Sequence, residues 1–310
     1  MGIVIGVDAG GSRTRVVVAD ASGETIASAE REGAAVKPGE VERSAGIIAA
    51  AVRDALITLD PTLGTPRALC AGVAGAGRES ERRALSEALM NEALADDVMV
   101  VTDAEIALSD AFNDESGIVL IAGTGSIAFG RGPAGVLERV GGWGPFIGDE
   151  GGGYWIARRA LSIVTAATDG REPDTSLVGA VLTAAEVDEV EALIPWAASA
   201  TVSQIASLAP VVVASAESGD LRANALLGLA AEELVLHVRT LARSLFQDER
   251  AAVQVALGGG LLEPGSALRR RVEHRLKSAV PGGKVHAAAI VAVNGAVRRA
   301  LHMGVEQSAG

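Results

Sequence analysis

The sequence predicts an α/β protein built from two related domains, and three observations lead to this fold class. Short apolar runs of strand character alternate with longer segments of helical period. A unit of strand, glycine turn and strand occurs at residues 3–20 and again at residues 117–131. The length of 310 residues suits two domains of ~100–200 residues each. We therefore expect a first domain at 1–115 and a second at 116–290.

The individual elements follow from their residue patterns. Residues 3–8 and 15–20 are Val- and Ile-rich runs on either side of a glycine turn, which predicts a β-hairpin. Further apolar runs predict strands at 67–74, 98–102, 117–122, 127–131 and 253–257. Apolar residues at three- and four-residue spacing predict helices at 41–59, 78–94, 153–168, 177–193, 204–218, 220–246, 265–279 and 291–301.

Composition and charge exclude several kinds of partner. The chain holds 27 Lys and Arg against 39 Asp and Glu, a formal net charge of −12, so neither nucleic acid nor an anionic membrane is the expected partner. The 4 Phe, 3 Trp and 1 Tyr are too few for base-stacking platforms. The single cysteine, Cys70, can form no intrachain disulfide and no site of paired thiolates. An N-terminus without the features of a signal peptide then predicts a cytoplasmic protein.

Three glycine-rich turns follow predicted strands and suit a polyphosphate. They are Gly10-Gly11-Ser12, Gly123-Thr124-Gly125-Ser126 and Gly258-Gly259-Gly260. Glycine lets backbone N–H groups approach an anion, and hydroxyl side chains add donors. The alternative for any one of them is a tight turn that needs a positive φ. The chain contains no P-loop or Rossmann glycine motif.

Two aspartates lie at the ends of predicted strands. Asp8 ends the first strand, where a carboxylate can hold the water shell of Mg²⁺ beside phosphates; the alternative is a turn-capping role. Asp103 follows the run 98–102, at the end of a strand where open α/β sheets place ligands. A carboxylate there can accept a proton from an attacking hydroxyl. The alternative for Asp103 is the N-cap of the following helix.

Residues 141–155 hold four of the eight aromatic residues beside the acidic pair Asp149-Glu150. An aromatic face with nearby carboxylates is what a sugar requires. We expect Trp143 and Asp149 to serve such a site, and Tyr154 and Trp155 to pack the following helix. Elsewhere, Cys70 is predicted to be a small core residue, the four histidines show no ligand-like spacing, and Arg269-Arg270-Arg271 is predicted to be a solvated helix face.

Taken together, these motifs resemble the N-acetylglucosamine kinase and BadF/BadG/BcrA/BcrD ATPase family of the sugar kinase–Hsp70–actin superfamily. The residues that carry the resemblance span nearly the whole chain: 6–14, 71–75, 102–103, 123–126, 141–144, 148–151, 257–260 and 294–295. The Gly-Asp-Glu-Gly-x-x-Tyr-Trp spacing at 148–155 is similar to that of the amino-sugar kinases in particular.

The resemblance implies a duplicated RNase H-like fold of two lobes with ATP and Mg²⁺ in the cleft between them, a helix at about 291–310 that packs back on the first lobe, and a homodimer. It implies that ATP is bound by Gly10, Gly11, Ser12, Arg13, Thr14, Gly123, Thr124, Gly125, Ser126, Gly258, Gly259 and Gly260. Asp103 is the implied base for the sugar 6-hydroxyl, and Asp8 the residue that holds Mg²⁺ through water. The implied sugar contacts are Ala74, Gly75, Asp103, Thr124, Trp143, Gly144 and Asp149.

One departure concerns the sugar. Members that bind N-acetylglucosamine usually carry a sugar-contacting Asn after the second or third strand, and residues 33–39 contain none. The small Ala74-Gly75 loop leaves room for a larger substituent, such as the lactyl ether of N-acetylmuramic acid. The expected function is therefore an ATP-dependent kinase of N-acetylglucosamine or a close relative, with glucosamine and N-acetylmuramic acid as alternative acceptors. Two alternatives belong to other classes: an ATPase that activates a dehydratase by electron transfer, and an actin-like polymer or nucleotide-dependent sensor.

Overall fold

The computed structural model describes residues 2–113, 115–246 and 252–303, and the chain divides into two compact units. Unit 1 takes residues 1–115 and 290–310, and unit 2 takes residues 116–289. No helix within the described residues has both the length and the apolar character that a membrane crossing needs.

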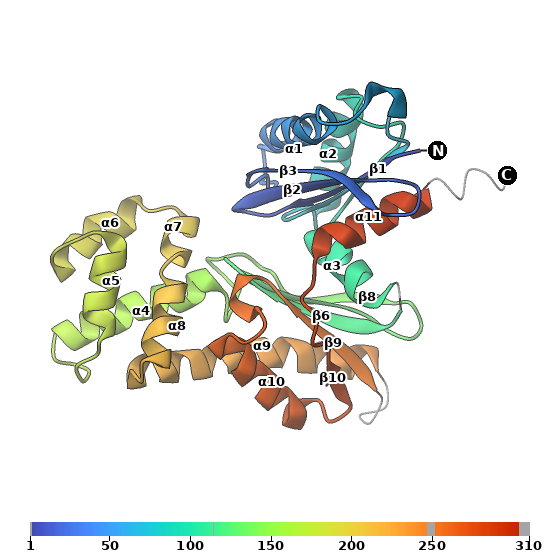
Figure 1. The fold of residues 1–310 in the computed structure, drawn as a ribbon. Coiled ribbons are helices and arrows are strands. Elements are labelled where there is room, and N and C mark those ends of the chain that lie inside the picture. The colour runs from blue at the N-terminus through green and yellow to red at the C-terminus, as the bar shows by residue number, and fades with distance from the viewer. Residues whose placement is uncertain (1, 114, 247–251, 304–310) are drawn as a thin grey trace. The chain divides into compact units, whose positions relative to one another are not determined.

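Unit 1 contains a five-stranded sheet in the order β3-β2-β1-β4-β5 (Figure 1). The strands are β1 (Val4–Ala9), β2 (Arg13–Ala19), β3 (Thr25–Glu32), β4 (Ala68–Val73) and β5 (Val98–Val101). The first three strands form antiparallel pairs, whereas β1, β4 and β5 run parallel. Parallel strands put their carboxyl ends at one edge, which is where this fold class places ligands.

Helices cover both faces of this sheet. They are α1 (Val41–Leu56), α2 (Glu79–Asn91), α3 (Asp103–Phe112) and α11 (Ala292–Met303), with the short 3₁₀ turn η1 (Pro61–Leu63). Alternation along β1 explains the two layers: Ile5 and Val7 pack with α1 and α2, whereas Val4 packs with α3 and α11. Gly6 permits the close approach of α11, because a Cβ there would lie 2.6 Å from the backbone nitrogen of Val297.

Unit 2 repeats the strand order of unit 1. Its sheet runs β10-β9-β6-β7-β8, so that in both units the first strand lies between the second and the fourth. The strands are β6 (Gly117–Ala122), β7 (Ser126–Arg131), β8 (Leu137–Gly141), β9 (Val253–Gly258) and β10 (Gly283–Val285). Here too the first three strands pair antiparallel and the other two pairings are parallel. The expected duplicated α/β fold is confirmed at the level of topology.

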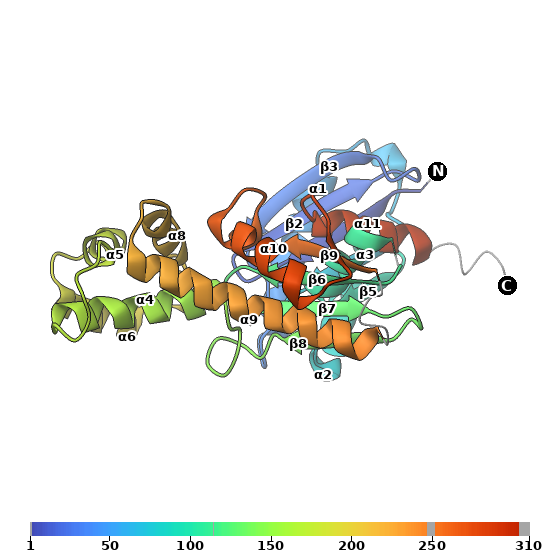
Figure 2. The same ribbon diagram turned by 90° about the horizontal axis from the view of Figure 1, so that it is seen from below.

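The helices of unit 2 form a larger set. They are α4 (Gly153–Thr168), α5 (Leu177–Ala185), η2 (Val190–Ala192), α6 (Leu193–Ser199), α7 (Val202–Ala206), α8 (Ala209–Glu217), α9 (Leu221–Leu245), η3 (Gly260–Leu262) and α10 (Ala267–Ala279). Figures 1 and 2 show that α4 to α8 gather beside one end of α9, whose other end continues along the sheet. One apolar core joins the sheet to α4, α9 and α10.

The C-terminal helix α11 packs against α3, β1 and β4 of unit 1 (Figure 1). The Arg67 guanidinium donates to the Leu301 carbonyl at 2.9 Å, and the backbone N–H of Val291 donates to Asp110 Oδ2 at 2.8 Å. Of the predicted segment at about 291–310, residues 304–310 lie outside the described residues.

Candidate active site

Unit 1 gathers several of the sequence-predicted site residues at the carboxyl edge of its sheet. Asp8 lies near the end of β1, Ala74 follows β4, and Asp103 follows β5. The Ala74 N–H donates to the Ala9 carbonyl at 2.9 Å, which ties the loop after β4 to the end of β1. Asp8 and Asp103 are close enough for the Asp103 charge to raise the pKa of Asp8. Two acidic groups thus share this edge.

The Asp8 carboxyl is half-buried, and burial followed by the charge of Asp103 raises its pKa to about 6, against the opposing influence of Arg15 and Arg13. A divalent cation would relieve this accumulation of negative charge. Within the described residues no group of three His, Cys, Asp or Glu side chains forms a metal cage. Mg²⁺ commonly uses one or two carboxylates together with water and substrate phosphates, and Asp8 fits that mode.

We expect the Asp8→Asn variant to unfold at a higher temperature than wild type at pH 8 without Mg²⁺. The raised pKa means that the folded state prefers the protonated carboxyl, so the stability that this group contributes is lost as pH rises from about 4 to about 6. Asn cannot ionise, so the variant avoids this loss. Its free energy of unfolding at pH 8 should exceed that of wild type by at most ~1–3 kcal/mol. Thermal unfolding at pH 4 and pH 8 measures the difference, which should vanish at pH 4.

Asp20→Asn is the control for this measurement. Hydrogen bonds from Ser22 and Glu24 lower the pKa of the exposed Asp20 carboxyl, so its removal should not stabilise the protein at pH 8. An Asp8→Asn variant no more stable than wild type at pH 8 would contradict the burial of an unpaired charge.

Asp103 is the first residue of α3 rather than its N-cap. Thr102 caps the helix: its hydroxyl accepts from the Glu105 N–H at 3.1 Å, and the Glu105 carboxylate accepts in return from the Thr102 N–H at 2.9 Å. The capping alternative for Asp103 is therefore wrong. Its carboxylate accepts a hydrogen bond from the Ala104 N–H at 3.0 Å, and burial raises its pKa. A raised pKa makes a carboxylate a better proton acceptor near neutral pH.

Segment 33–37 connects the first glycine turn to the Ala74-Gly75 loop. The Ala35 N–H donates to the Gly10 carbonyl at 3.1 Å, and the Val36 N–H donates to the Ala74 carbonyl at 2.9 Å. Side chains alternate along it, so that Ala34 and Val36 are buried and Lys37 is exposed. The segment that lacks the Asn therefore lies beside the first glycine turn and the loop after β4, and it carries the exposed Lys37.

Two hydroxyl groups predicted to contact phosphate serve the fold instead. Thr14 is fully buried, and its hydroxyl donates to the Glu32 carbonyl at 2.8 Å. Ser126 has 4% exposure, and its hydroxyl donates to the Glu150 carbonyl at 2.7 Å. Both residues lie near the start of the second strand of a hairpin, where Thr14 pairs with Ala9 and Ser126 pairs with Ala122. Their hydroxyls point to internal carbonyls, so the structure argues against Thr14 and Ser126 as phosphate ligands. Arg13, on the surface, lies 3.5 Å from Glu30.

Unit 2 brings its two glycine turns together. Gly259 adopts a φ of +86°, and a Cβ there would overlap the Ala122 carbonyl immediately before the turn at Gly123. The start of α4 contacts the same turn, because the N–H groups of Gly153 and Tyr154 donate to the carbonyls of Gly123 and Thr124 at 2.8 and 2.9 Å. Gly258 itself is buried as the last residue of β9.

Three glycines in these turns have no structural reason to lack a side chain. At Gly11, Gly123 and Gly260 an added Cβ would meet nothing within 4 Å, and none of the three has a positive φ. Their neighbours Gly125 and Gly259 differ, because a Cβ would overlap Asp149 or Ala122. Open space over a glycine is what the close approach of a ligand needs.

The loop between β8 and α4 holds the Trp143 and Asp149 pair. Asp149 is in the left-handed region at φ +58° and is buried, and its Oδ1 accepts from the Gly144 N–H at 2.9 Å. Burial raises the pKa of Asp149. Trp143 is 63% exposed, and its ring lies 4.7 Å from the Arg139 guanidinium. Unit 2 therefore joins an exposed aromatic face to a fixed carboxylate.

Several structural features of this loop and of the third turn were not predicted. Phe146 and Ile147, on the same loop as Trp143, are 76% and 79% exposed. Tyr154 is buried, as expected. Arg269, predicted to be solvated, is 3% exposed: it donates to the Leu262 carbonyl at 3.1 Å and to the His286 carbonyl at 2.9 Å. That prediction was wrong, and Arg269 stabilises the turn that follows Gly260.

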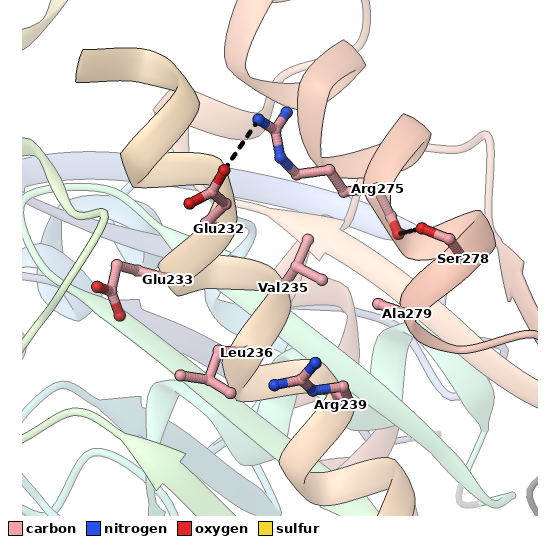
Figure 3. A pocket seen from close by; sticks show the side chains of 8 residues that line it. All are labelled: Glu232, Glu233, Val235, Leu236, Arg239, Arg275, Ser278 and Ala279. Atoms are coloured by element: carbon pink, nitrogen blue, oxygen red, sulfur yellow. Dashed lines mark hydrogen bonds and ion pairs between the residues drawn. The ribbon is translucent and has the colours of Figure 1, made fainter. Parts of the chain in front are cut away.

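A cavity of about 380 Å³ between α9 and α10 lies apart from these residues (Figure 3). Its lining includes Leu236 and the ion pair of Arg275 with Glu232, 3.3 Å apart. None of the sequence-predicted site residues lines it.

The two units, with the same strand order and a glycine turn in the first hairpin of each, define a duplicated RNase H-like fold of the actin-like ATPase class. The chain matches the BadF/BadG/BcrA/BcrD ATPase family over residues 5–301 and belongs to that family.

Named relatives give this assignment detail. The chain is 32% identical over 261 residues to the N-acetylmuramic acid/N-acetylglucosamine kinase of Clostridium acetobutylicum, covering 84% of this chain and 85% of the relative. It is 28% identical to the N-acetyl-D-glucosamine kinase of Dictyostelium discoideum, covering 91% and 92%. A solved structure from Chromobacterium violaceum, to which N-acetylglucosamine kinase activity is ascribed, shares 29% identity with a TM-score of 0.78 over 96% of this chain and 98% of that chain.

Proposed function

We propose that this protein is an ATP-dependent amino-sugar kinase that transfers the γ-phosphate of ATP to the 6-hydroxyl of N-acetylglucosamine or a close relative. The observation that carries the proposal is the Asp103 carboxylate, which is released from helix capping by Thr102 and lies beside Asp8 at the ligand edge of unit 1. The named relatives, all of them amino-sugar kinases, support the same reaction class.

The chemistry assigns one task to each group. Asp103 accepts the proton of the sugar 6-hydroxyl. The hydroxyl oxygen forms a bond to the γ-phosphorus, and the bond from this phosphorus to the ADP oxygen breaks. The N–H groups of Gly10 and Gly123 donate within their own turns, to the carbonyls of Arg13 and Gly125. The remaining backbone N–H groups of the turns at Gly10-Gly11-Ser12 and Gly123-Thr124-Gly125 bind the phosphates, and the turn at Gly259-Gly260 borders the nucleoside. Asp8 would hold Mg²⁺, which when bound supplies positive charge against the phosphates.

Unit 2 supplies two of the proposed sugar contacts, Trp143 and Asp149. The exposed Trp143 ring suits the apolar C–H face of a pyranose, and the fixed Asp149 carboxylate suits its hydroxyl groups. Both residues lie on the β8–α4 loop. The Gly144 N–H donates to Asp149 within this loop and links its two halves.

N-acetylmuramic acid is a second candidate acceptor. The segment at 33–39 has no Asn, and Lys37 is exposed on it, with its nitrogen 3.9 Å from Glu40. An exposed ammonium beside the small Ala74-Gly75 loop suits the carboxylate of a lactyl substituent, and a Clostridium relative is named for both sugars.

The dehydratase-activator alternative fits poorly. Cys70 is fully buried in β4, and burial raises the pKa of its thiol to about 12, whereas an iron–sulfur ligand must be a thiolate. The homodimer and the cytoplasmic location stay predictions.

We expect an amino sugar to stimulate release of ADP from Mg-ATP strongly, with the sugar 6-phosphate as product. Purified protein is assayed alone and with N-acetylglucosamine, N-acetylmuramic acid, glucosamine, N-acetylmannosamine or glucose. The sugar with the highest kcat/KM is then identified as the substrate. Equal slow turnover with every sugar would overturn the proposed function and favour a sensor or activator.

A further inference from the structure

We infer that His237 is a positioning residue for the acceptor sugar: with Glu150 it holds the loop that carries Trp143 and Asp149 in place on α9. This inference rests on the proposed function. None of the sequence motifs includes His237, which is separated from Glu150 by most of the helices of unit 2.

Helix α9 supports this loop at both of its ends. Gly151, near the end of the loop, lies so close to α9 that a Cβ would meet the side chain of Leu234 at 2.6 Å. Gly141, at its beginning, lies against the His237 ring, where a Cβ would be 3.0 Å from Nε2. His237 and Leu234 therefore form the surface on which the loop rests.

A histidine is an unusual choice for this position. Its neighbours on the packed face of α9, Leu234, Val238 and Leu241, are apolar. His237 is itself buried on that face, with only 7% exposure. Its Nδ1 is buried and has no hydrogen-bond partner within the described residues. Leaving a buried polar atom unpaired opposes folding, so packing alone would favour Leu or Phe. The polar partner that accounts for the histidine is Glu150, whose Oε2 lies 3.9 Å from Nε2.

Glu150 transmits this contact to Asp149. Its carbonyl accepts the Ser126 hydroxyl at 2.7 Å, so its backbone is fixed to the start of β7. The preceding residue, Asp149, holds a left-handed backbone conformation, which surrounding contacts must maintain. Without the contact between His237 and Glu150, the backbone conformation that positions the Asp149 carboxylate would lose part of its support.

Burial lowers the pKa of His237, although Glu150 opposes the shift. The ring is therefore neutral at pH 7, and the inference places its proton on Nε2, which faces the Glu150 carboxylate. The 3.9 Å separation is longer than a direct hydrogen bond, so the inference requires the half-exposed Glu150 side chain to move closer to the ring.

The test is a double-mutant cycle with steady-state kinetics on the full chain. His237→Phe keeps a ring against Gly141 and removes both nitrogens, and Glu150→Ala removes the carboxylate that faces the ring. We expect each change to raise the KM for the sugar by about tenfold, with the KM for ATP within about twofold. The double variant should be no worse than either single one, because both break one interaction. His237→Gln, whose amide can donate to Glu150, should recover most of the affinity.

His274→Phe on the exposed face of α10 is the matched control and should leave both KM values unchanged. Additive effects in the double variant, or equal rises in both KM values, would overturn the inference. Hydrogen exchange separates it from the proposed function: peptide 141–153 should exchange faster in His237→Phe, and peptide 67–74 should not. Unchanged exchange at 141–153 overturns the positioning role, whereas a wild-type protein without sugar-dependent turnover overturns the kinase.

Discussion

Asp103→Asn should reduce sugar-dependent turnover by about 10²–10⁴-fold while it leaves the affinity for ATP within a few-fold. General-base catalysis by one positioned side chain contributes an effect of this size. The fold should tolerate the change, because Thr102 and Glu105 cap α3 without Asp103. An Asn side chain can also accept the hydrogen bond from the Ala104 N–H. Initial rates with saturating sugar, together with the equilibrium binding of ATP, measure the two quantities.

Asp110→Asn provides the comparison on the same helix. Burial raises the pKa of Asp110 as it does that of Asp103, and the Asn oxygen can keep the hydrogen bond from Val291. This variant should retain wild-type turnover. If Asp103→Asn does so too, Asp103 is not the base and another group must accept the proton.

Gly125→Ala should abolish turnover and destabilise the protein, whereas Gly123→Ala should leave stability unchanged and weaken ATP binding. At Gly125 the new Cβ would overlap Asp149 Oδ2, and that carboxylate cannot easily move because its Oδ1 accepts from Gly144. Overpacking of this kind costs ~1–3 kcal/mol, which would lower the unfolding midpoint by several degrees. At Gly123 the methyl group would meet open space, where we propose that a phosphate approaches.

Thermal unfolding and the KM for ATP separate these two effects. The destabilisation by Gly125→Ala should largely disappear in an Asp149→Ala background, since the overlapping carboxylate is gone. Equal unfolding midpoints for the two glycine variants would mean that Asp149 does not pack on the turn. An unchanged KM for ATP in Gly123→Ala would remove this turn from the phosphate site.

Much of the fold could be predicted from the sequence because the buried strands are short apolar runs bounded by glycine or aspartate. Helix α4 begins and ends where the pattern placed it, at Gly153 and Thr168. Strand β3 was missed because it is a charged edge strand, exposed along most of its length and paired with β2 alone. The predicted helix at 177–193 ends early because Glu186 takes a left-handed conformation, a role that a sequence normally signals with glycine.

The candidate site, like the fold, could be predicted only in part from the sequence. Asp8 and Asp103 could be placed together because parallel strands end at a common edge. The direction of the Thr14 and Ser126 hydroxyls could not be predicted. It depends on the carbonyls of Glu32 and Glu150, which are 18 and 24 residues away along the chain. Arg269 was wrongly predicted to be solvated for the same reason. The carbonyls to which it donates, those of Leu262 and His286, lie outside its helix.

The return of α11 to unit 1 has a consequence for the order in which the chain is made. Unit 2 is one continuous stretch, so a ribosome delivers all of it before it delivers the helix that covers Val4, Gly6 and Cys70. Until then, one apolar face of the first sheet lacks part of its cover, and the edge that carries Asp8 belongs to an incomplete unit. Nascent chains that stop short of α11 are therefore the species that chaperones and proteases would encounter. A circular permutant that begins with α11 would remove this delay.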